Sequence, residues 1–129
     1  MKRIAVIDIG TNSMRLMLCK IADNIISKKE KELMITRIGK DVSRTGMITE
    51  KSFVRNIDGA QEVHAIATSA VRDALNGEAF VAEALSQSGI DVRIINGEEE
   101  AELGLIGVIS EIQNPRETVL VIDLGGGST

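Results

Sequence analysis

The chain has 129 residues, of which 43% are hydrophobic and 26% charged, and its formal net charge is −4. This balance is typical of a globular domain with one core and argues against a disordered chain. The aromatic residues are two phenylalanines, with no Trp or Tyr, so stacking platforms for nucleic-acid bases are lacking. We therefore expect no nucleic-acid partner, and affinity for any polyanion must come from a local group of donors.

The cysteine content and the N-terminus bear on the cellular compartment. Cys19 is the only cysteine, so no internal disulfide can form. Met1-Lys2-Arg3 leads directly into a strand-like segment without the apolar stretch of a signal peptide. No apolar run reaches the roughly 20 residues that a membrane-spanning helix needs. We expect a cytoplasmic protein with no membrane segment.

The first third of the chain predicts a three-stranded meander. Residues 3–9 are rich in Ile and Val and end in Asp-Ile-Gly, which is typical of a buried strand that runs into a turn. Residues 15–21 are strand-like after this turn, and residues 25–38 supply a return strand after a polar reversal. Residues 39–48 have no periodicity and predict a loop. Three basic residues in or next to this loop, Arg37, Lys40 and Arg44, either are solvated or guide a long polyanion.

The rest of the chain predicts alternating helices and strands. The expected strands are 63–67, 92–96 and 118–124, and the expected helices begin near Glu50 and Ser69 and cover 78–88 and 98–112. The last two helices each have an apolar face, formed by Phe80, Val81, Ala84 and Leu85 in one and by Ala101, Leu105, Val108 and Ile109 in the other. The predicted fold class is α/β, with a mixed sheet of ribonuclease-H-like order βββαβαβα and a new strand at the end.

One strand-turn occurs twice in the sequence. The copies read Val6-Ile7-Asp8-Ile9-Gly10-Thr11-Asn12-Ser13 and Val121-Ile122-Asp123-Leu124-Gly125-Gly126-Gly127-Ser128. In each, an apolar strand ends in a carboxylate, and the Gly-containing turn leaves backbone N–H groups free to point at an anion. The carboxylate oxygens suit a Mg²⁺ ion that would offset phosphate charge. A single copy would be more simply a flexible turn, but the duplication favours a phosphate clamp, to which Arg15 adds a bidentate donor.

Two further segments lie where a strand gives way to a helix. Thr68-Ser69-Ala70-Val71-Arg72-Asp73 offers hydroxyls and a guanidinium to a phosphate, although the same residues make ordinary helix caps and surface charges. Asn96-Gly97-Glu98-Glu99-Glu100-Ala101-Glu102 is a favourable first helical turn, in which one inward Glu could serve as a general base. We expect Cys19 and His64 to have structural roles and not catalytic ones.

As a set, these four motifs resemble the Ppx/GppA family of exopolyphosphatases and guanosine pentaphosphate phosphohydrolases. The resemblance covers essentially the whole chain, with the motifs in the same order. It implies a ribonuclease-H-like domain of the actin, sugar kinase and chaperone ATPase superfamily, in which two such domains close on a cleft that holds phosphate.

The resemblance also implies roles for individual residues. Asp8 and Asp123 would flank Mg²⁺, and Glu100, rather than Glu99, would be the catalytic base. Phosphate would be held by three loops, which contribute Thr11, Asn12, Ser13 and Arg15; Ser69 and Arg72; and Gly125, Gly126, Gly127, Ser128 and Thr129. The implied reaction is Mg²⁺-assisted attack of water on a terminal phosphoryl group of polyphosphate or guanosine pentaphosphate, where positioning and charge neutralisation dominate catalysis.

The chain departs from the family pattern at two places. Family members continue past Gly-Gly-Gly-Ser-Thr with a metal-holding Glu and a second domain. They also have a longer helical stretch between the segments matched by Ile57 and Ala60, so a crossover helix is shortened here at Asp58-Gly59. We therefore expect residues 1–117 to form one domain and residues 118–129 to be the first strand and phosphate loop of a second. Such a chain would carry half of the active site and be inactive alone.

Two alternative functions stay open at this stage. One is a sensor that binds polyphosphate or guanosine tetraphosphate with the same clamp and does not hydrolyse it. The other is a phosphotransferase of the same superfamily, whose nucleotide pocket would lie in the second domain. The preference between polyphosphate and guanosine pentaphosphate also stays open, as does the oligomeric state, including a homodimer of the full-length protein.

Overall fold

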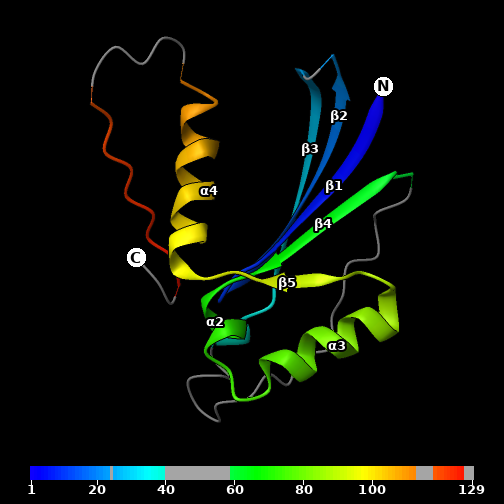
Figure 1. The fold of residues 1–129 in the computed structure, drawn as a ribbon, viewed down its shortest axis with the longest axis vertical. Helices are drawn as coiled ribbons and strands as arrows, with labels where there is room; N and C mark the ends of the chain where they lie inside the picture. Colours follow the sequence, from blue (N-terminus) through cyan, green and yellow to red (C-terminus); the bar gives the residue numbers. More distant parts are fainter. Residues whose placement is uncertain (24, 40–58, 113–117, 127–129) are drawn as a thin grey trace.

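The computed structural model describes residues 1–23, 25–39, 59–112 and 118–126. These residues form a five-stranded sheet in the order β3-β2-β1-β4-β5 (Figure 1). The strands are β1 (Lys2–Ile9), β2 (Ser13–Ala22), β3 (Ile25–Ile35), β4 (Glu62–Ala67) and β5 (Val92–Ile94). β2 is antiparallel to both β1 and β3, whereas β4 is parallel to β1 and β5 is parallel to β4. The predicted mixed α/β sheet is confirmed.

The sheet topology decides where a site can form. β1, β4 and β5 run in the same direction, so their carboxyl ends meet at one edge of the sheet. Antiparallel pairing brings the start of β2 and the end of β3 to that edge as well, because Ile9 lies opposite Met14 and Ser13 lies opposite Ile35. Open α/β sheets bind ligands beyond the carboxyl ends of their parallel strands. The first repeated strand-turn lies at this edge.

One face of the sheet forms the core. Alternate residues of a strand point to opposite faces, so the buried side chains of Ala5, Ile7 and Ile9 all point to the same side. Leu16 and Ala65 are the neighbours of Ile7 on the adjoining strands and are buried with it. Asp8 points to the opposite face. The core therefore holds β1 firmly while leaving its carboxylate outside.

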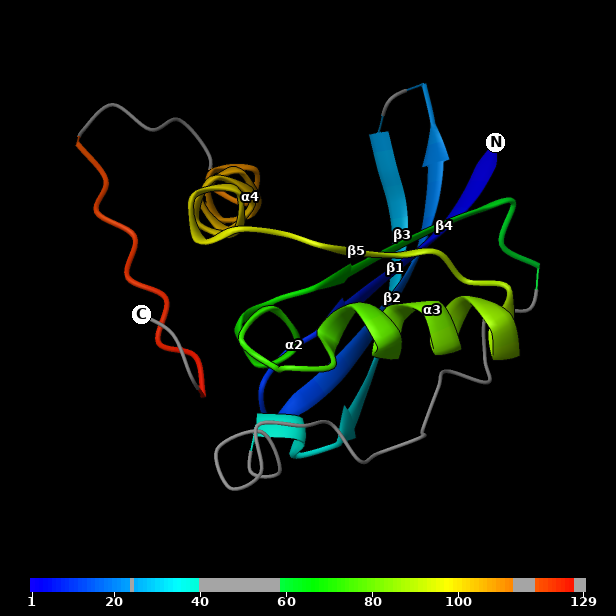
Figure 2. The same ribbon diagram turned by 60° about the horizontal axis from the view of Figure 1, so that its bottom comes forward.

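Helix α3 (Gly77–Ser88) covers the core face, as Figure 2 shows. Phe80 and Ala84, one helical turn apart, are its buried side chains, and Val81 packs against the cluster. The helix ends as predicted at Gly89, whose φ of 72° is left-handed. The prediction for Leu85 is wrong, because this side chain is 48% exposed. It follows Ala84 by about 100° around the helix and so lies beyond the narrow buried stripe.

Helix α4 (Gly97–Ile109) stands to one side of the sheet, away from α3, in both views of the ribbon. It has no buried residue. The predicted helix is confirmed, and the four residues of its predicted apolar face are exposed among the described residues, namely Ala101, Leu105, Val108 and Ile109.

The segment 118–126 runs beside α4 and has no strand structure (Figure 1). The predicted strand over residues 118–124 is therefore wrong for this structure. A strand is held by hydrogen bonds to a neighbouring strand, and none of the described strands lies beside this segment. The division into two domains stays a prediction.

The helix expected near Glu50 and most of the loop before it lie outside the described residues. Among the helices that the structure describes, none combines the length and the apolar character needed to cross a membrane.

Candidate functional site

The predicted first phosphate loop is a tight turn between β1 and β2. The backbone N–H of Gly10 donates to the carbonyl oxygen of Ser13 at 3.0 Å, which closes the turn around Thr11 and Asn12. Ser13 is the first residue of β2. Arg15 lies two residues further on, directly opposite Asp8 in the β1–β2 pairing, so these two side chains are neighbours on the open face of the sheet. The pair borders a hollow of about 390 Å³ on that face.

The second segment joins the first through the short helix α2 (Ser69–Arg72). Thr68 follows β4, and its backbone N–H donates to the carbonyl oxygen of Ile9 at 3.2 Å. The hydroxyl groups of Thr11 and Ser69 lie 2.8 Å apart and share a hydrogen bond. Thr68 makes no side-chain cap to the helix, which removes the ordinary capping interpretation for this residue. Two predicted phosphate-binding residues, distant in sequence, are thus in contact.

The acidic turn of α4 separates its glutamates. The side chain of Asn96 caps the helix by accepting a hydrogen bond from the backbone N–H of Glu99 at 2.8 Å. The Glu99 carboxylate accepts a hydrogen bond from Arg93 at 2.6 Å. The Glu100 carboxylate instead lies 3.2 Å from Nη1 of Arg72. Glu100 therefore faces the predicted phosphate-binding loops, and Glu99 is occupied elsewhere.

Arg72 links this turn to the end of β5. Its Nη1 group donates to the carbonyl oxygen of Ile95 at 2.8 Å as well as to Glu100. The backbone N–H of Ile95 in turn donates to the carbonyl oxygen of Ala67 at 3.0 Å. Arg72 is about one quarter exposed, with a side-chain exposure of 26%. One guanidinium is thereby held at a fixed place beside the carboxylate, with donor groups left over for a ligand.

Asp8 lies in an unfavourable place for a negative charge. Burial raises the pKa of its carboxyl above the ordinary value of 3.8. The guanidinium of Arg15 lowers the pKa of Asp8, and the nearby carboxylates of Glu100 and Asp123 raise it. Glu100 and Asp123 are thus close enough to Asp8 to act on its charge, although the three residues belong to separate segments. A bound cation would relieve this repulsion.

The acidic residues fit a Mg²⁺ ion that keeps most of its water. Among the described residues, no three His, Cys, Asp or Glu side chains lie close enough together to hold a metal ion. Mg²⁺ in phosphate-handling sites usually retains several waters and contacts only one or two carboxylates. Asp8, which is half-buried, and Asp123, which is exposed, would supply hard oxygen ligands of this kind.

A cavity of about 640 Å³ lies between α4 and the C-terminal segment. Its lining includes Arg72, Glu100, Asp123 and Gly125. The neighbouring Gly126 lies against the first loop, since a Cβ atom on it would come within 2.3 Å of Nδ2 of Asn12. The two copies of the repeated strand-turn therefore approach each other at this cavity. Three predicted residues of the second copy lie outside the described part of the chain, namely Gly127, Ser128 and Thr129.

Most of the chain matches one protein family. Residues 20–129 match the model of the Ppx/GppA phosphatase family. The chain belongs to this family.

Curated relatives agree with this assignment. The chain is 34% identical to the bifunctional 3-dehydroquinate synthase/phosphatase of Fusobacterium nucleatum, across 97% of this chain and 22% of the relative. It is 32% identical to exopolyphosphatase 2 of Mycobacterium tuberculosis, across 98% of this chain and 46% of the relative. The chain thus spans less than half the length of these relatives. The second alignment covers 148 positions, so the relative carries residues that this 129-residue chain lacks.

Solved structures of Ppx/GppA proteins share the fold. The type II variant of the Aquifex aeolicus Ppx/GppA phosphatase superposes with a TM-score of 0.76 at 30% identity, over 87% of this chain and 41% of that one. An exopolyphosphatase from Cytophaga hutchinsonii gives a TM-score of 0.74 at 31% identity, over 84% of this chain and 39% of that one.

Sequence reasoning missed the segment 36–39, which packs against the predicted first phosphate loop. We predicted that the third strand continues to residue 38, but β3 ends at Ile35. The backbone N–H groups of Thr36 and Arg37 leave the sheet and donate to the carbonyl oxygen of Asn12, at 3.0 and 2.9 Å. Gly39 is the one signal in the sequence for a change of chain direction here, and the sequence pattern predicts it as the start of the following loop.

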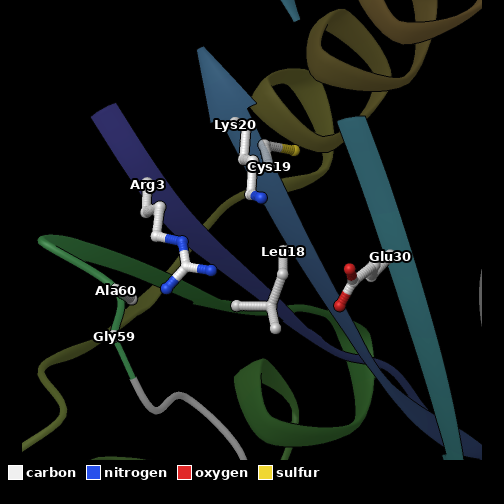
Figure 3. Close-up of a pocket in the computed structure, with 7 residues that line it drawn as sticks. All are labelled: Arg3, Leu18, Cys19, Lys20, Glu30, Gly59 and Ala60. Atoms are coloured by element: carbon white, nitrogen blue, oxygen red, sulfur yellow. The ribbon is translucent and has the colours of Figure 1, made fainter. Parts of the chain in front are cut away.

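A second hollow lies at the opposite end of the sheet and is separate from the site (Figure 3). It measures about 110 Å³, and its lining includes Arg3, Lys20, Glu30 and the buried Cys19. Arg3 lies near the start of β1, whereas Asp8 lies near its end. None of the predicted site residues lines this hollow.

Proposed function

We propose that this chain supplies one wall of the active site of a phosphoanhydride hydrolase that releases terminal orthophosphate from inorganic polyphosphate. Guanosine pentaphosphate is the second candidate substrate. The observation that carries the proposal is the position of Glu100, which faces Arg72 and Asp8 while its neighbour Glu99 is paired with Arg93. Family membership and the exopolyphosphatase relative support it.

The proposed binding step uses donors from three loops. Thr11, Asn12 and Ser13 present the first loop, Ser69 is hydrogen-bonded to it, and Arg72 offers its remaining N–H groups. Glycines of the second strand-turn would close over the phosphate from the other side. A Mg²⁺ ion held by Asp8 and Asp123 would offset the charge of the phosphate oxygens.

The proposed chemical step uses Glu100 as the general base. A carboxylate within hydrogen-bond reach of a water can take its proton as the oxygen attacks the terminal phosphorus. The bond from that phosphorus to the bridging oxygen breaks, and orthophosphate and a polyphosphate shortened by one unit leave. Arg72 stabilises the charge that develops on the equatorial oxygens and also holds Glu100 in place.

The test is orthophosphate release by the full-length protein from polyphosphate and from guanosine pentaphosphate, with Mg²⁺ and after chelation. We expect release from polyphosphate that depends on Mg²⁺. Calorimetry with guanosine tetraphosphate runs in parallel. Tight binding without release would contradict the proposal and indicate a sensor, and turnover that requires an added nucleoside diphosphate would indicate a phosphotransferase. The cytoplasmic location expected from the sequence stays a prediction.

A further inference from the structure

The segment 36–39, which runs from the end of β3 into the start of a helix, is hydrogen-bonded to the predicted first phosphate loop. Two successive carbonyl oxygens of the loop are bonded to it. Thr36 and Arg37 donate their backbone N–H groups to Asn12, at 3.0 and 2.9 Å, and Gly39 donates to Thr11 at 2.7 Å. We name residues 36–39 the loop clamp.

The loop clamp decides where the N–H groups of the loop point. In a trans peptide the C=O of one residue and the N–H of the next point in opposite directions. Because the C=O of Thr11 points at the clamp, the N–H of Asn12 points away from it. The same holds for the C=O of Asn12 and the N–H of Ser13. The clamp thus fixes the direction of two successive N–H donors, those of Asn12 and Ser13. Both point to the opposite side of the loop, where an anion would accept from them.

The clamp depends on an uncommon backbone conformation. Arg37 has a φ of 57°, one of two positive values among the described non-glycine residues. The N–H groups that bond to Asn12 precede the Cα atom of Arg37, and the N–H of Gly39 that bonds to Thr11 follows it. The φ of Arg37 therefore sets where Gly39 lies relative to the first two donors, and left-handed backbone here turns the chain so that all three reach the loop. The hydrogen bond of Arg37 to the loop is made by its backbone, and the residue is exposed.

Gly39 completes the clamp by its close approach to the loop. A Cβ atom at this position would lie 2.0 Å from Cγ2 of Thr11, which is far inside contact distance. The chain therefore comes close enough for the 2.7 Å hydrogen bond only because residue 39 has no side chain.

We propose that Arg37 is a positioning residue for polyanion binding, and that it acts through its left-handed backbone and not through its charge. The proposal rests on the proposed function, since it assumes that the first loop binds phosphate. The rival interpretation is that the exposed guanidinium guides a long polyanion. The two differ in what they require of residue 37, because one needs a residue that tolerates positive φ and the other needs a cation.

The test compares Arg37→Asn with Arg37→Val in the full-length protein. Asn tolerates the left-handed region, whereas a β-branched residue is strongly disfavoured there. We expect R37V to raise KM for polyphosphate about tenfold with a smaller change in kcat. We expect R37N, which also lacks the charge, to stay within about twofold of the unmodified protein.

Asp23 provides the matched control. It is the other described non-glycine residue with positive φ, at 51°, and it lies in the turn between β2 and β3, at the far end of these strands from the loop. Asp23→Val imposes the same kind of backbone penalty without touching the phosphate loop. We expect D23V to lower the melting temperature about as much as R37V and to leave KM unchanged.

The outcomes separate this proposal from the proposed function. An R37V protein with unchanged KM would overturn the proposal, and so would an equal rise of KM in R37N and R37V, which would assign the effect to the charge. If the unmodified protein binds polyphosphate without hydrolysing it, the proposed function fails. Calorimetry with polyphosphate then compares the affinities of R37V and R37N, and this comparison still tests the role of the clamp. If R37V does not fold, Arg37→Ala carries the comparison with a smaller backbone penalty.

Discussion

Asp8, a predicted site residue, lowers the stability of the folded chain when its carboxyl is ionised. Its carboxyl is half-buried and lies near Glu100 and Asp123, and burial first and then these charges raise its pKa above the ordinary 3.8. A group with a raised folded pKa binds more protons in the folded state, so stability falls as pH rises from the ordinary value through the raised one. The ionised form of Asp8 therefore destabilises the folded chain at neutral pH.

Substitution of Asp8 by Asn removes this penalty. We expect D8N to be more stable than the unmodified protein at pH 7 and equally stable near pH 3, where the carboxyl is protonated in both states. Urea unfolding at the two pH values measures the difference. Asp91→Asn, a change at an exposed carboxyl, serves as the control. The free energy of unfolding of D91N should differ between the two pH values by as much as that of the unmodified protein. A D8N protein that loses stability at pH 7 would show that Asp8 is stabilised and not penalised.

Some residue assignments lie beyond what a sequence pattern can decide. Glu98, Glu99 and Glu100 all suit the first turn of a helix, and the choice of Glu100 came from the family resemblance. In the structure the choice has a physical basis, since Arg93 pairs with Glu99 and Arg72 pairs with Glu100. Both contacts are set by how β4, β5 and α4 meet, and periodicity does not contain that information.

At the level of elements, the buried strands were the most predictable part. β1 and β4 combine β-branched residues with turn signals at their ends, and their bounds lie within one residue of those expected. The end of β3 was not predictable, because it depends on hydrogen bonds from Thr36 and Arg37 to a loop more than twenty residues earlier. The apolar character of α4 and of residues 118–124 was evident in the sequence, but burial and strand formation require partners that no described element supplies.

Two helix glycines test whether α3 and α4 are held differently. Gly77 opens α3 against the preceding segment, and a Cβ atom on it would lie 2.2 Å from the carbonyl oxygen of Val71. Gly107 lies in α4, where nothing comes within 4 Å of such an atom. We expect Gly77→Ala to destabilise the chain by roughly 1–3 kcal/mol. Gly107→Ala should stabilise it by up to about 1 kcal/mol.

Urea unfolding of the two variants measures both changes. Equal effects of the same sign would contradict the picture in which α3 is packed closely and α4 stands apart. Loss of stability in G107A alone would mean that α4 packs against a part of the protein that the structure does not describe.

At the scale of the molecule, the chain spans 46% of exopolyphosphatase 2 from Mycobacterium tuberculosis. Phosphoryl transfer in a two-walled cleft needs donors and ligands from both sides of the substrate. We expect the 129-residue chain alone to release no orthophosphate from polyphosphate in the presence of Mg²⁺, and the full-length protein to release it. Measurable Mg²⁺-dependent release by the short chain would show that these residues hold a complete site.

The position of Glu100 bears most directly on the proposed reaction, and the adjacent Glu99 supplies a matched control on the same helical turn. Phosphate release from polyphosphate is measured for the full-length protein carrying Glu100→Gln or Glu99→Gln. If Glu100 is the general base, E100Q lowers kcat by about 10²- to 10⁴-fold with KM little changed. E99Q, which loses only a contact with Arg93, keeps kcat within about twofold. An E100Q protein with unchanged kcat, or an equal loss in both variants, would contradict the assignment of Glu100 as the base.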